Sequence, residues 1–287
     1  MAGHIPGPGL NRPNAAVRLI DSHAHLQADA FAHDVEDVLA AARQKGVERV
    51  LSPGWDLVSS QGSISLAQRQ QVHASAGVHP HQAVQVDGST WIAISDLASR
   101  PEVVAVGETG LDYDRAFSSR EVQLVNLRRH LLLGSALDKP VILHCRSKPG
   151  QRDAQDDLLR EVEAAGRPAG VLHSFSGPVD YAERALELGL AISFSGLVFR
   201  RGEESSAVVA RLVPADRLLV ETDSPYLSPP GAPRRRNEPL WVAVTADWLA
   251  EQRGVEADAL GNGLVDAYDG LFKAARNRSL PSEPAKR

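Results

Sequence analysis

The sequence predicts a single-domain (β/α)8 barrel, also called a TIM barrel, and two observations lead to that fold class. Short apolar runs recur at fairly regular spacing along the 287 residues, and amphipathic stretches separate them. Eight such strand-and-helix units fit in about 250 residues, which is the usual size of this barrel. Because the same pattern also suits a sheet that does not close, a doubly wound open sheet stays the alternative.

The predicted strands are rich in Val, Ile and Leu and form apolar runs more than strict alternation. Such runs are typical of parallel strands that are buried on both faces. We expect the strands at residues 17–21, 49–53, 72–78, 103–108, 140–145, 169–174, 190–195 and 217–222.

Apolar residues at helical spacing occupy the stretches between the strands. Three of these patterns stop at Gly46, Gly166 and Gly189. Glycine is favoured just past a helix end because it adopts the left-handed backbone conformation there without strain. No linker or low-complexity block interrupts the chain between them, so we expect one domain at 17–275 between tails at 1–16 and 276–287. We expect the helices at residues 31–46, 57–71, 119–139, 156–166, 179–189, 206–213, 239–254 and 256–275.

Charge and composition limit the classes of partner. The formal net charge of −5 gives no overall attraction to nucleic acid or to anionic membranes, so an anionic substrate needs local positive charge or metal. The single cysteine, Cys145, excludes an internal disulfide and fits a reducing cytosol. No apolar run approaches the ~18 residues of a membrane helix, and residues 1–16 lack a signal-peptide pattern. We therefore expect a cytoplasmic protein with no membrane association and no obligatory protein partner.

The segment LIDSHAHLQ at residues 19–27 places two histidines at the end of the first predicted strand. In an extended segment, side chains i and i+2 point the same way, so His23 and His25 converge. Two neutral imidazoles this close can share a cation, whereas two separate hydrogen bonds to the backbone are the structural alternative.

Four other predicted strands end on residues of the same chemistry, namely Glu108, His144, His173 and Asp223. The carboxyl ends of barrel strands meet at the one mouth where barrel enzymes work, so all six side chains should gather there. Imidazole and carboxylate suit borderline or hard divalent cations. Six ligands exceed the need of one tetrahedral zinc ion with an open position.

We therefore predict two divalent ions (Mg²⁺, Mn²⁺ or Zn²⁺) about 3.5–4 Å apart at the C-terminal mouth. The two histidines of the first strand and Asp223 are assigned to one ion, and His144 and His173 to the other. Glu108 bridges them, and Glu108 and Asp223 are the predicted catalytic residues. Two divalent ions with only two carboxylate ligands keep a net positive charge. This charge favours an anionic phosphoryl substrate over a neutral amide.

These residues, in this order, resemble the TatD family of metal-dependent deoxyribonucleases over roughly residues 18–275. The resemblance implies a barrel, dependence on divalent metal, and hydrolysis of DNA phosphodiesters, often from the 3′ end. DNA, single-stranded or at its 3′ ends, is thus the expected substrate. The matching stretches are DSHAHL (21–26), GVHP (77–80), VGETGLDY (106–113), PVILHCR (140–146), GVLHSFSG (170–177), ISFSG (192–196), ETDSPYLSP (221–229) and RRRNEP (234–239).

The sequence departs from the family pattern at a few positions. Gln27 stands where the family usually has Asp, and Ala24 and Ser174 stand where it usually has Cys. The pattern before RNEP is also altered around Arg234 and Arg235, so the resemblance supports metal ligation more strongly than contacts with a polynucleotide. The fourth strand carries a glutamate and no nearby lysine, which argues against the dihydroorotase-like and phosphotriesterase-like branches with their carboxylated lysine.

Further residues at the mouth are candidates for substrate contact, with a structural role as the alternative for each. A guanidinium binds phosphate through its planar fork, and a local cation is needed in a protein of negative net charge. The ring of a tyrosine can pack against a sugar or base. The predicted contacts are His79, Arg146, Tyr226 and Arg235, with His81, Arg200 and Arg201 as weaker candidates.

Other polar residues near these motifs are expected to serve structure. Asp112 and Tyr113 should support a ligand or a turn, and Asn237 and Glu238 should brace the last loop. Strand alternation directs Cys145 away from the mouth, as a buried thiol.

The leading hypothesis is a two-metal nuclease that acts from a 3′ end and releases 5′-mononucleotides. One alternative is a metal-dependent hydrolase of another ester or amide, such as an aminoacyl-tRNA ester, on the same barrel. Assays of single-stranded DNA against small esters and amides separate these two. The other alternative is a non-catalytic metal or nucleic-acid binding protein, which binding without turnover in saturating metal would support.

Overall fold

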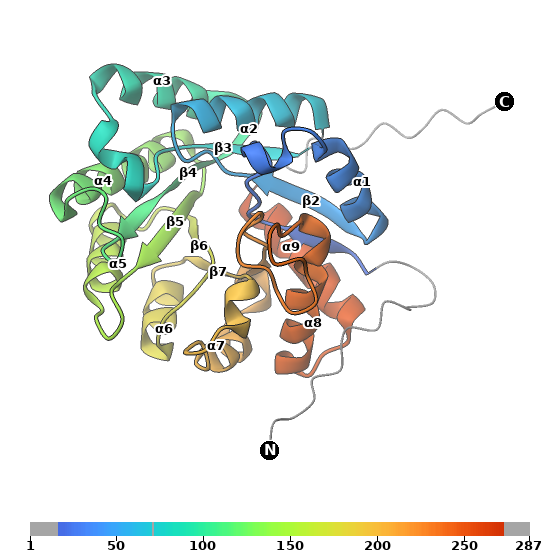
Figure 1. The fold of residues 1–287 in the computed structure, drawn as a ribbon. Coiled ribbons are helices and arrows are strands. Elements are labelled where there is room, and N and C mark those ends of the chain that lie inside the picture. Colours follow the sequence, from blue (N-terminus) through green and yellow to red (C-terminus); the bar gives the residue numbers. More distant parts are fainter. Residues whose placement is uncertain (1–16, 71, 273–287) are drawn as a thin grey trace.

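The computed structural model describes residues 17–70 and 72–272, and its strands form the barrel that the sequence predicts (Figure 1). One sheet runs in the order β1-β2-β3-β4-β5-β6-β7-β8, with each strand parallel to the next. The backbone N–H of Ser22 donates to the carbonyl of Val220 at 3.0 Å, and Ala24 forms a parallel bridge with Ser224. These contacts bring β1 and β8 together, so the open-sheet alternative is wrong. The predicted tails at 1–16 and 276–287 lie outside the described residues.

All eight strands overlap their predicted ranges, but several differ from them in length. The strands are β1 (Leu19–Asp21), β2 (Val47–Ser52), β3 (His73–Ala76), β4 (Val103–Asp112), β5 (Val141–Arg146), β6 (Gly170–Leu172), β7 (Ala191–Phe194) and β8 (Leu218–Val220). The expectation that the fourth strand ends at Glu108 is wrong, because β4 keeps its pairing with β5 as far as Asp112 opposite Arg146. In contrast, β6 and β8 are shorter than predicted, so His173 and Asp223 follow their strands.

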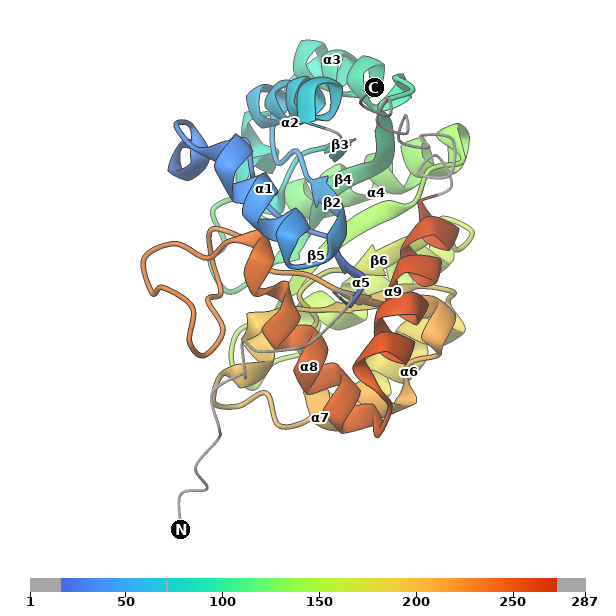
Figure 2. The same cartoon turned by 90° about the vertical axis from the view of Figure 1, so that its right-hand side faces the viewer.

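Helices surround the strands on the outside of the barrel (Figure 1, Figure 2). They are α1 (Val35–Gln44), α2 (Leu57–Gln70), α3 (Gly88–Ser99), α4 (Arg120–Leu137), α5 (Asp153–Ala164), α6 (Val179–Glu187), α7 (Ser206–Leu212), α8 (Val242–Arg253) and α9 (Ala257–Leu271). The sequence patterns did not predict α3. Its apolar residues do not all lie on one face of the helix, because Ile94 is buried whereas Ile92 is 63% exposed. Its start is nonetheless marked by Asp87, whose carboxylate accepts a hydrogen bond from the N–H of Thr90.

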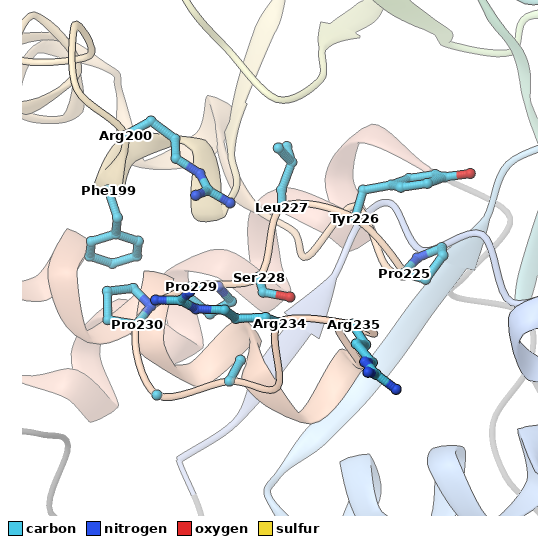
Figure 3. Close-up of a pocket in the computed structure, with 12 residues that line it drawn as sticks. Phe199, Arg200, Pro225, Tyr226, Leu227, Ser228, Pro229, Pro230, Arg234 and Arg235 are labelled. Atoms are coloured by element: carbon cyan, nitrogen blue, oxygen red, sulfur yellow. The ribbon is translucent and has the colours of Figure 1, made fainter.

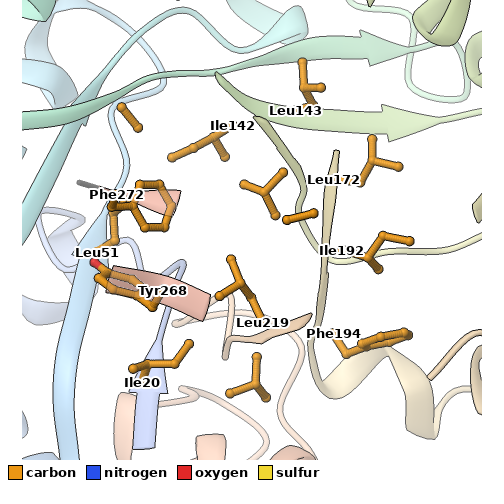
Figure 4. Close-up of a cluster of buried hydrophobic side chains, with 14 of the residues drawn as sticks. Ile20, Leu51, Ile142, Leu143, Leu172, Ile192, Phe194, Leu219, Tyr268 and Phe272 are labelled. Atoms are coloured by element: carbon orange, nitrogen blue, oxygen red, sulfur yellow. The ribbon is translucent and has the colours of Figure 1, made fainter. Parts of the chain in front are cut away.

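Apolar side chains fill the space between the strands and the helices (Figure 4). Tyr268 of α9 and Phe272 just beyond it are fully buried among side chains of the strands. The Tyr268 hydroxyl lies 2.7 Å from Nδ1 of His73, the first residue of β3. The helix α9 therefore covers the amino ends of the strands. The predicted ligands gather at the opposite, carboxyl ends, where barrel enzymes generally have their active sites.

Candidate metal centre

The four histidines that were predicted as ligands lie together at the carboxyl ends of the strands. The rings of His23 and His173 stack with their centroids 4.0 Å apart, and the centroids of His23 and His25 are 4.9 Å apart. Nδ1 of His144 is 3.2 Å from Nε2 of His173. Side chains from three well-separated parts of the chain thus form one cluster, with spacings that a pair of metal ions can span.

Glu108 lies between two groups of histidines. Its Oε1 is 2.9 Å from Nε2 of His173 and 3.4 Å from Nδ1 of His144. Its Oε2 is 3.3 Å from Nε2 of His23. The side chain of Glu108 is 3% exposed, so this carboxylate contacts the histidines of the cluster and hardly any solvent. One oxygen for each histidine group is the geometry of a bridging ligand.

Asp223 completes the cluster from the far end of the sequence. Its Oδ1 lies 3.3 Å from Nε2 of His25 and 3.8 Å from Nε2 of His23. The backbone of Asp223 has φ of +55°, in the left-handed region, and its N–H donates to the carbonyl of His23 at 2.8 Å. Asp tolerates this conformation better than most residues do. The local backbone therefore turns the carboxylate towards the two histidines of the first strand.

The charges in the cluster are strongly coupled. Burial alone would raise the pKa of Glu108, but His173, His79 and His23 outweigh it and hold the pKa well below its usual value. Burial alone would lower the pKa of His173, but Glu108 and Glu221 outweigh it and raise the pKa well above its usual value. A divalent cation competes with protons for these atoms, so metal affinity should fall as the pH is lowered.

The hydrogen-bonding state of the cluster fits a metal centre. Within the described residues, Nδ1 of His23 and Nδ1 of His25 are buried with no hydrogen-bond partner. Nε2 of His23 and Nε2 of His144 are buried too and form no hydrogen bond, although carboxylate oxygens lie 3.3 and 3.4 Å away. Each such buried group costs about 1–3 kcal/mol unless something binds it. Three sets of side chains place their ligand atoms within 4.8 Å of one another, namely His23, His173 and Asp223; His23, His25 and Glu108; and His79, Glu108 and His144. Imidazoles with carboxylates are donors that suit divalent first-row metals.

His79 is closer to the centre than its predicted role as a substrate contact required. Its Nε2 lies 3.4 Å from Oε1 of Glu108, and its Nδ1 accepts a hydrogen bond from the N–H of His81. Burial lowers the pKa of His79 well below its usual value despite the nearby Glu108. A neutral imidazole in this position can act as a metal ligand. The signal that could have indicated it is the position of GVHP after the third strand, which matches the other strand-end histidines.

Two carboxylates orient the histidines from behind. Oδ2 of Asp112 lies 2.7 Å from Nε2 of His81 and 3.4 Å from Nε2 of His144. Oε1 of Glu221 lies 3.2 Å from Nδ1 of His173. Carboxylates behind ligating histidines set the ring orientation and the tautomer. Asp112 was expected to support a ligand or turn, whereas Glu221 was missed, although it stands two residues before Asp223 in the ETDSP segment.

A further buried acid ties the first strand to the last. Asp21 accepts hydrogen bonds from the N–H of Thr222 at 2.9 Å and from its hydroxyl at 2.6 Å. Burial raises the pKa of Asp21 to about 8. These contacts lie two residues before His23 and one before Asp223, so they set the spacing of the two metal-facing segments.

Three of the four predicted substrate contacts line a cavity of about 500 Å³ at the cluster. Arg146 lines it, and its guanidinium pairs with Asp114 at 2.7 Å. Tyr226 also lines it, with its side chain largely exposed and its ring centroid 6.0 Å from that of His25. Arg235 lies in the neighbouring groove and does not line this cavity. The structure thus brings three of the four predicted contacts, His79 included, to the metal cluster.

Asn237, Glu238 and Cys145 were expected to serve structure. The amide of Asn237 donates to the carbonyls of Thr222 and Tyr226, at 3.0 and 2.8 Å, and so braces the loop after β8. Glu238 pairs with Arg236. Burial raises the pKa of the Cys145 thiol to about 12, so at neutral pH it is not a thiolate nucleophile.

Comparison with known protein families gives a match to the TatD-related DNases over residues 20–273. The chain belongs to the TatD family. A relative from Erwinia billingiae, named 3′-5′ ssDNA/RNA exonuclease TatD, is 39% identical over 253 residues, which cover 85% of this chain and 94% of that protein. An uncharacterized metal-dependent hydrolase, YabD of Bacillus subtilis, is 30% identical over 258 residues, which cover 89% of this chain and 99% of that protein.

Solved structures of the TatD family share the fold. The TatD homologue YJJV from Escherichia coli superposes with a TM-score of 0.81 at 30% identity, covering 90% of this chain and 99% of that one. A TatD family hydrolase from Entamoeba histolytica has a TM-score of 0.80 at 23% identity, covering 90% and 99% of the two chains, and shows the same barrel. The family assignment makes the chain a metal-dependent hydrolase, as the resemblance implied. None of the helices in the described residues is long and apolar enough to cross a membrane.

Proposed function

We propose that this TatD-family protein is a divalent-metal-dependent nuclease that removes nucleotides from the 3′ end of single-stranded DNA. The observation that carries the proposal is Glu108, which directs one oxygen to each of two histidine groups below a cavity that Arg146 lines. Relatives named 3′-5′ ssDNA/RNA exonuclease, 36–39% identical over most of the chain, support the substrate and the direction. RNA is a second substrate to test, and a cytoplasmic location stays a prediction.

The proposed centre holds two divalent ions. His23, His25 and Asp223 would bind one ion, His144 and His173 the other, with Glu108 between them and His79 beside the second ion. Imidazole-rich ligand sets favour Mn²⁺ or Zn²⁺ over Mg²⁺. Ions in such a centre supply Lewis acidity for phosphodiester hydrolysis.

The protein's own side chains have distinct roles in this proposal. The Asp223 carboxylate, 15% exposed, faces the cavity and accepts the proton of the attacking water. The Arg146 guanidinium, held by Asp114, binds the nonbridging phosphoryl oxygens through charge-assisted hydrogen bonds. Tyr226 packs against the sugar or base of the terminal nucleotide.

Replacement of Glu108 by glutamine tests the proposal, because glutamine keeps the shape and removes the bridging charge. We expect kcat on single-stranded DNA in saturating Mn²⁺ to fall on the order of 1000-fold. The circular dichroism spectrum should stay unchanged. The matched control is Glu204→Gln, an exposed acid on the β7–α7 connection, which should keep full activity.

The assay is a time course on 3′-labelled and 5′-labelled oligonucleotides, single-stranded and duplex, with Mg²⁺, Mn²⁺ or Zn²⁺ and with chelator. Stepwise shortening of a 5′-labelled single strand supports removal from the 3′ end. Full activity of the Glu108→Gln protein would contradict the bridging role. Turnover of small esters or amides without turnover of DNA would favour a different hydrolase on the same barrel.

A further inference from the structure

A groove of about 770 Å³ lies beside the metal cavity, between the β7–α7 and β8–α8 connections (Figure 3). It shares Tyr226 and Leu227 with that cavity, so the two spaces adjoin. We call it the arginine groove. Its lining includes Phe199, Arg200, Tyr226, Leu227, Arg234 and Arg235.

The charge of the arginine groove is positive and unneutralised. Arg200, Arg234 and Arg235 are exposed, and their guanidinium groups form no ion pair or hydrogen bond with any described residue. The next residue, Arg236, differs, because it pairs with Asp34 at 2.8 Å and Glu238 at 2.7 Å. Among the described residues that line the groove, none is acidic. Three free cations in a protein of net negative charge indicate a site for a polyanion.

Aromatic side chains accompany these cations. Phe199 ends the short 3-10 helix η3 (Gly196–Phe199), and it lies half-buried with its ring centroid 6.3 Å from that of Trp248. Tyr226, 60% exposed, stands where the groove meets the metal cavity. In Figure 3, Phe199 and Arg200 approach from one side, and the loop with Arg234 and Arg235 forms the other. Cations that track a backbone, together with aromatic faces that stack bases, characterise grooves for single-stranded nucleic acid.

A second space of about 740 Å³, which shares His144, Arg146 and Asp223 with the metal cavity, fits a polyanion less well. It contains Arg146, Lys148 and Arg201, but Asp114, Glu203 and Asp223 line it as well. Arg146, which Asp114 holds, is already assigned to the phosphoryl group at the reaction centre. Its cations are therefore largely offset, so the arginine groove is the better path for a negatively charged strand.

We propose that the arginine groove binds the single-stranded segment on the 5′ side of the bond that is hydrolysed. This inference rests on the proposed 3′-end nuclease activity, in which one nucleotide lies beyond the bond and the rest of the strand extends on the 5′ side. Arg200, Arg234 and Arg235 contact successive phosphates, and Phe199 stacks on a base. The groove thus makes the enzyme favour longer single strands over dinucleotides.

The test is a triple variant, Arg200→Ala with Arg234→Ala and Arg235→Ala. Its matched control replaces three exposed arginines near the carboxyl-terminal ends of α1, α2 and α3, at the opposite end of the barrel. Both triples change the net charge equally. The control substitutions are Arg43→Ala, Arg69→Ala and Arg100→Ala.

Binding is measured in chelator by fluorescence anisotropy of a labelled 12-mer of single-stranded phosphorothioate DNA. We expect the groove triple to bind about tenfold more weakly or worse, and the slope of log affinity against log salt to become shallower by about 2. The control triple should match the wild type. A separate Phe199→Leu variant should bind about fivefold more weakly or worse with an unchanged salt slope, because it removes stacking and no charge.

Hydrolysis assays distinguish the role of the groove from that of the reaction centre. The groove triple should keep wild-type kcat/KM on a dinucleotide. Its kcat/KM on the 12-mer should fall towards the dinucleotide value. Unchanged binding and hydrolysis of the 12-mer would overturn the proposal, and so would an equal loss on dinucleotide and 12-mer. If the wild type hydrolyses no nucleic acid, the proposed activity fails, while a selective binding loss in the groove triple still supports the groove.

Discussion

Glu108 shows how much of the centre depends on single residues. It is buried and ionised, and it stays so because histidines from several strands surround it. The clustering of the predicted ligands could be anticipated from the sequence because their chemistry is unusual at strand ends, as in the HxH of His23 and His25. His79 and Glu221 were harder to assign, because a histidine or glutamate near a strand end is often structural. Their roles depend on which way the side chain turns, and a strand pattern does not specify that.

His130 offers a residue-scale prediction, although the sequence pattern assigned it no role. Its Nε2 accepts from the N–H of Val78 at 3.0 Å, and its Nδ1 donates to the carbonyl of Asn126 at 2.6 Å. Burial lowers the pKa of His130 to about 3. The unfolded chain therefore takes up a proton below pH ~6.5, whereas the folded chain does not until about pH 3, so this residue's contribution to stability falls as the pH drops through that window.

Urea unfolding of the wild type and His130→Gln at pH 7 and pH 4 checks this expectation. The wild type should lose about 3 kcal/mol more stability than the variant between these two pH values. The variant keeps all other titrating groups, so the difference isolates His130. Equal losses in the two proteins would contradict the neutral, doubly hydrogen-bonded state.

At the scale of elements, β4 carries Glu108 and differs most from its predicted extent. The stretch GETG reads as a loop, but Gly107 and Gly110, with φ of +122° and +136°, let β4 continue beside β5. A Cβ at Gly110 would overlap the carbonyl oxygen of His144. This close approach fixes the backbone of His144, a proposed ligand, on the neighbouring strand. Sequence periodicity identifies strands and most helices, but it cannot anticipate a strand that bends around glycines.

Gly110→Ala should therefore cost about 2 kcal/mol or more of unfolding free energy. It should also weaken metal binding, because the backbone at His144 must move. The control is Gly263→Ala in α9, where an added Cβ meets nothing within 4 Å and alanine should stabilise the helix by about 0.5–1 kcal/mol. Urea titration and Mn²⁺ titration measure the two effects. A Gly110→Ala protein as stable as the wild type would show that β4 and β5 are not held at this distance.

For the whole molecule, the two ends of the barrel have opposite characters. Tyr268 and Phe272 make the amino end apolar and closed, and the carboxyl end keeps the buried histidines and carboxylates. The fold class was predictable because alternating strands and helices repeat along most of the chain. Closure of the sheet was not, because it depends on contacts between residues 22 and 220 that no local pattern reveals.

Metal should stabilise the whole fold, because the ion binds the folded cluster and satisfies its unpartnered histidines. At a metal concentration about 100 times Kd, the gain is about 2.7 kcal/mol, which raises Tm by about 5–10 °C. Thermal unfolding with Mn²⁺ or Zn²⁺ against chelator measures it. Glu108→Gln should show a clearly smaller rise. No rise with Mg²⁺, Mn²⁺ or Zn²⁺ would argue against a resident metal centre.

The seam between β1 and β8 has one more consequence. His23 near the beginning of the barrel and Asp223 near its end share this seam, where the N–H of Asp223 binds the carbonyl of His23. A chain still emerging from the ribosome lacks Asp223 until most of the barrel has been synthesised. A growing polypeptide therefore lacks the complete set of proposed metal donors, so we expect metal binding, and hydrolysis that needs it, only after β8 has been made.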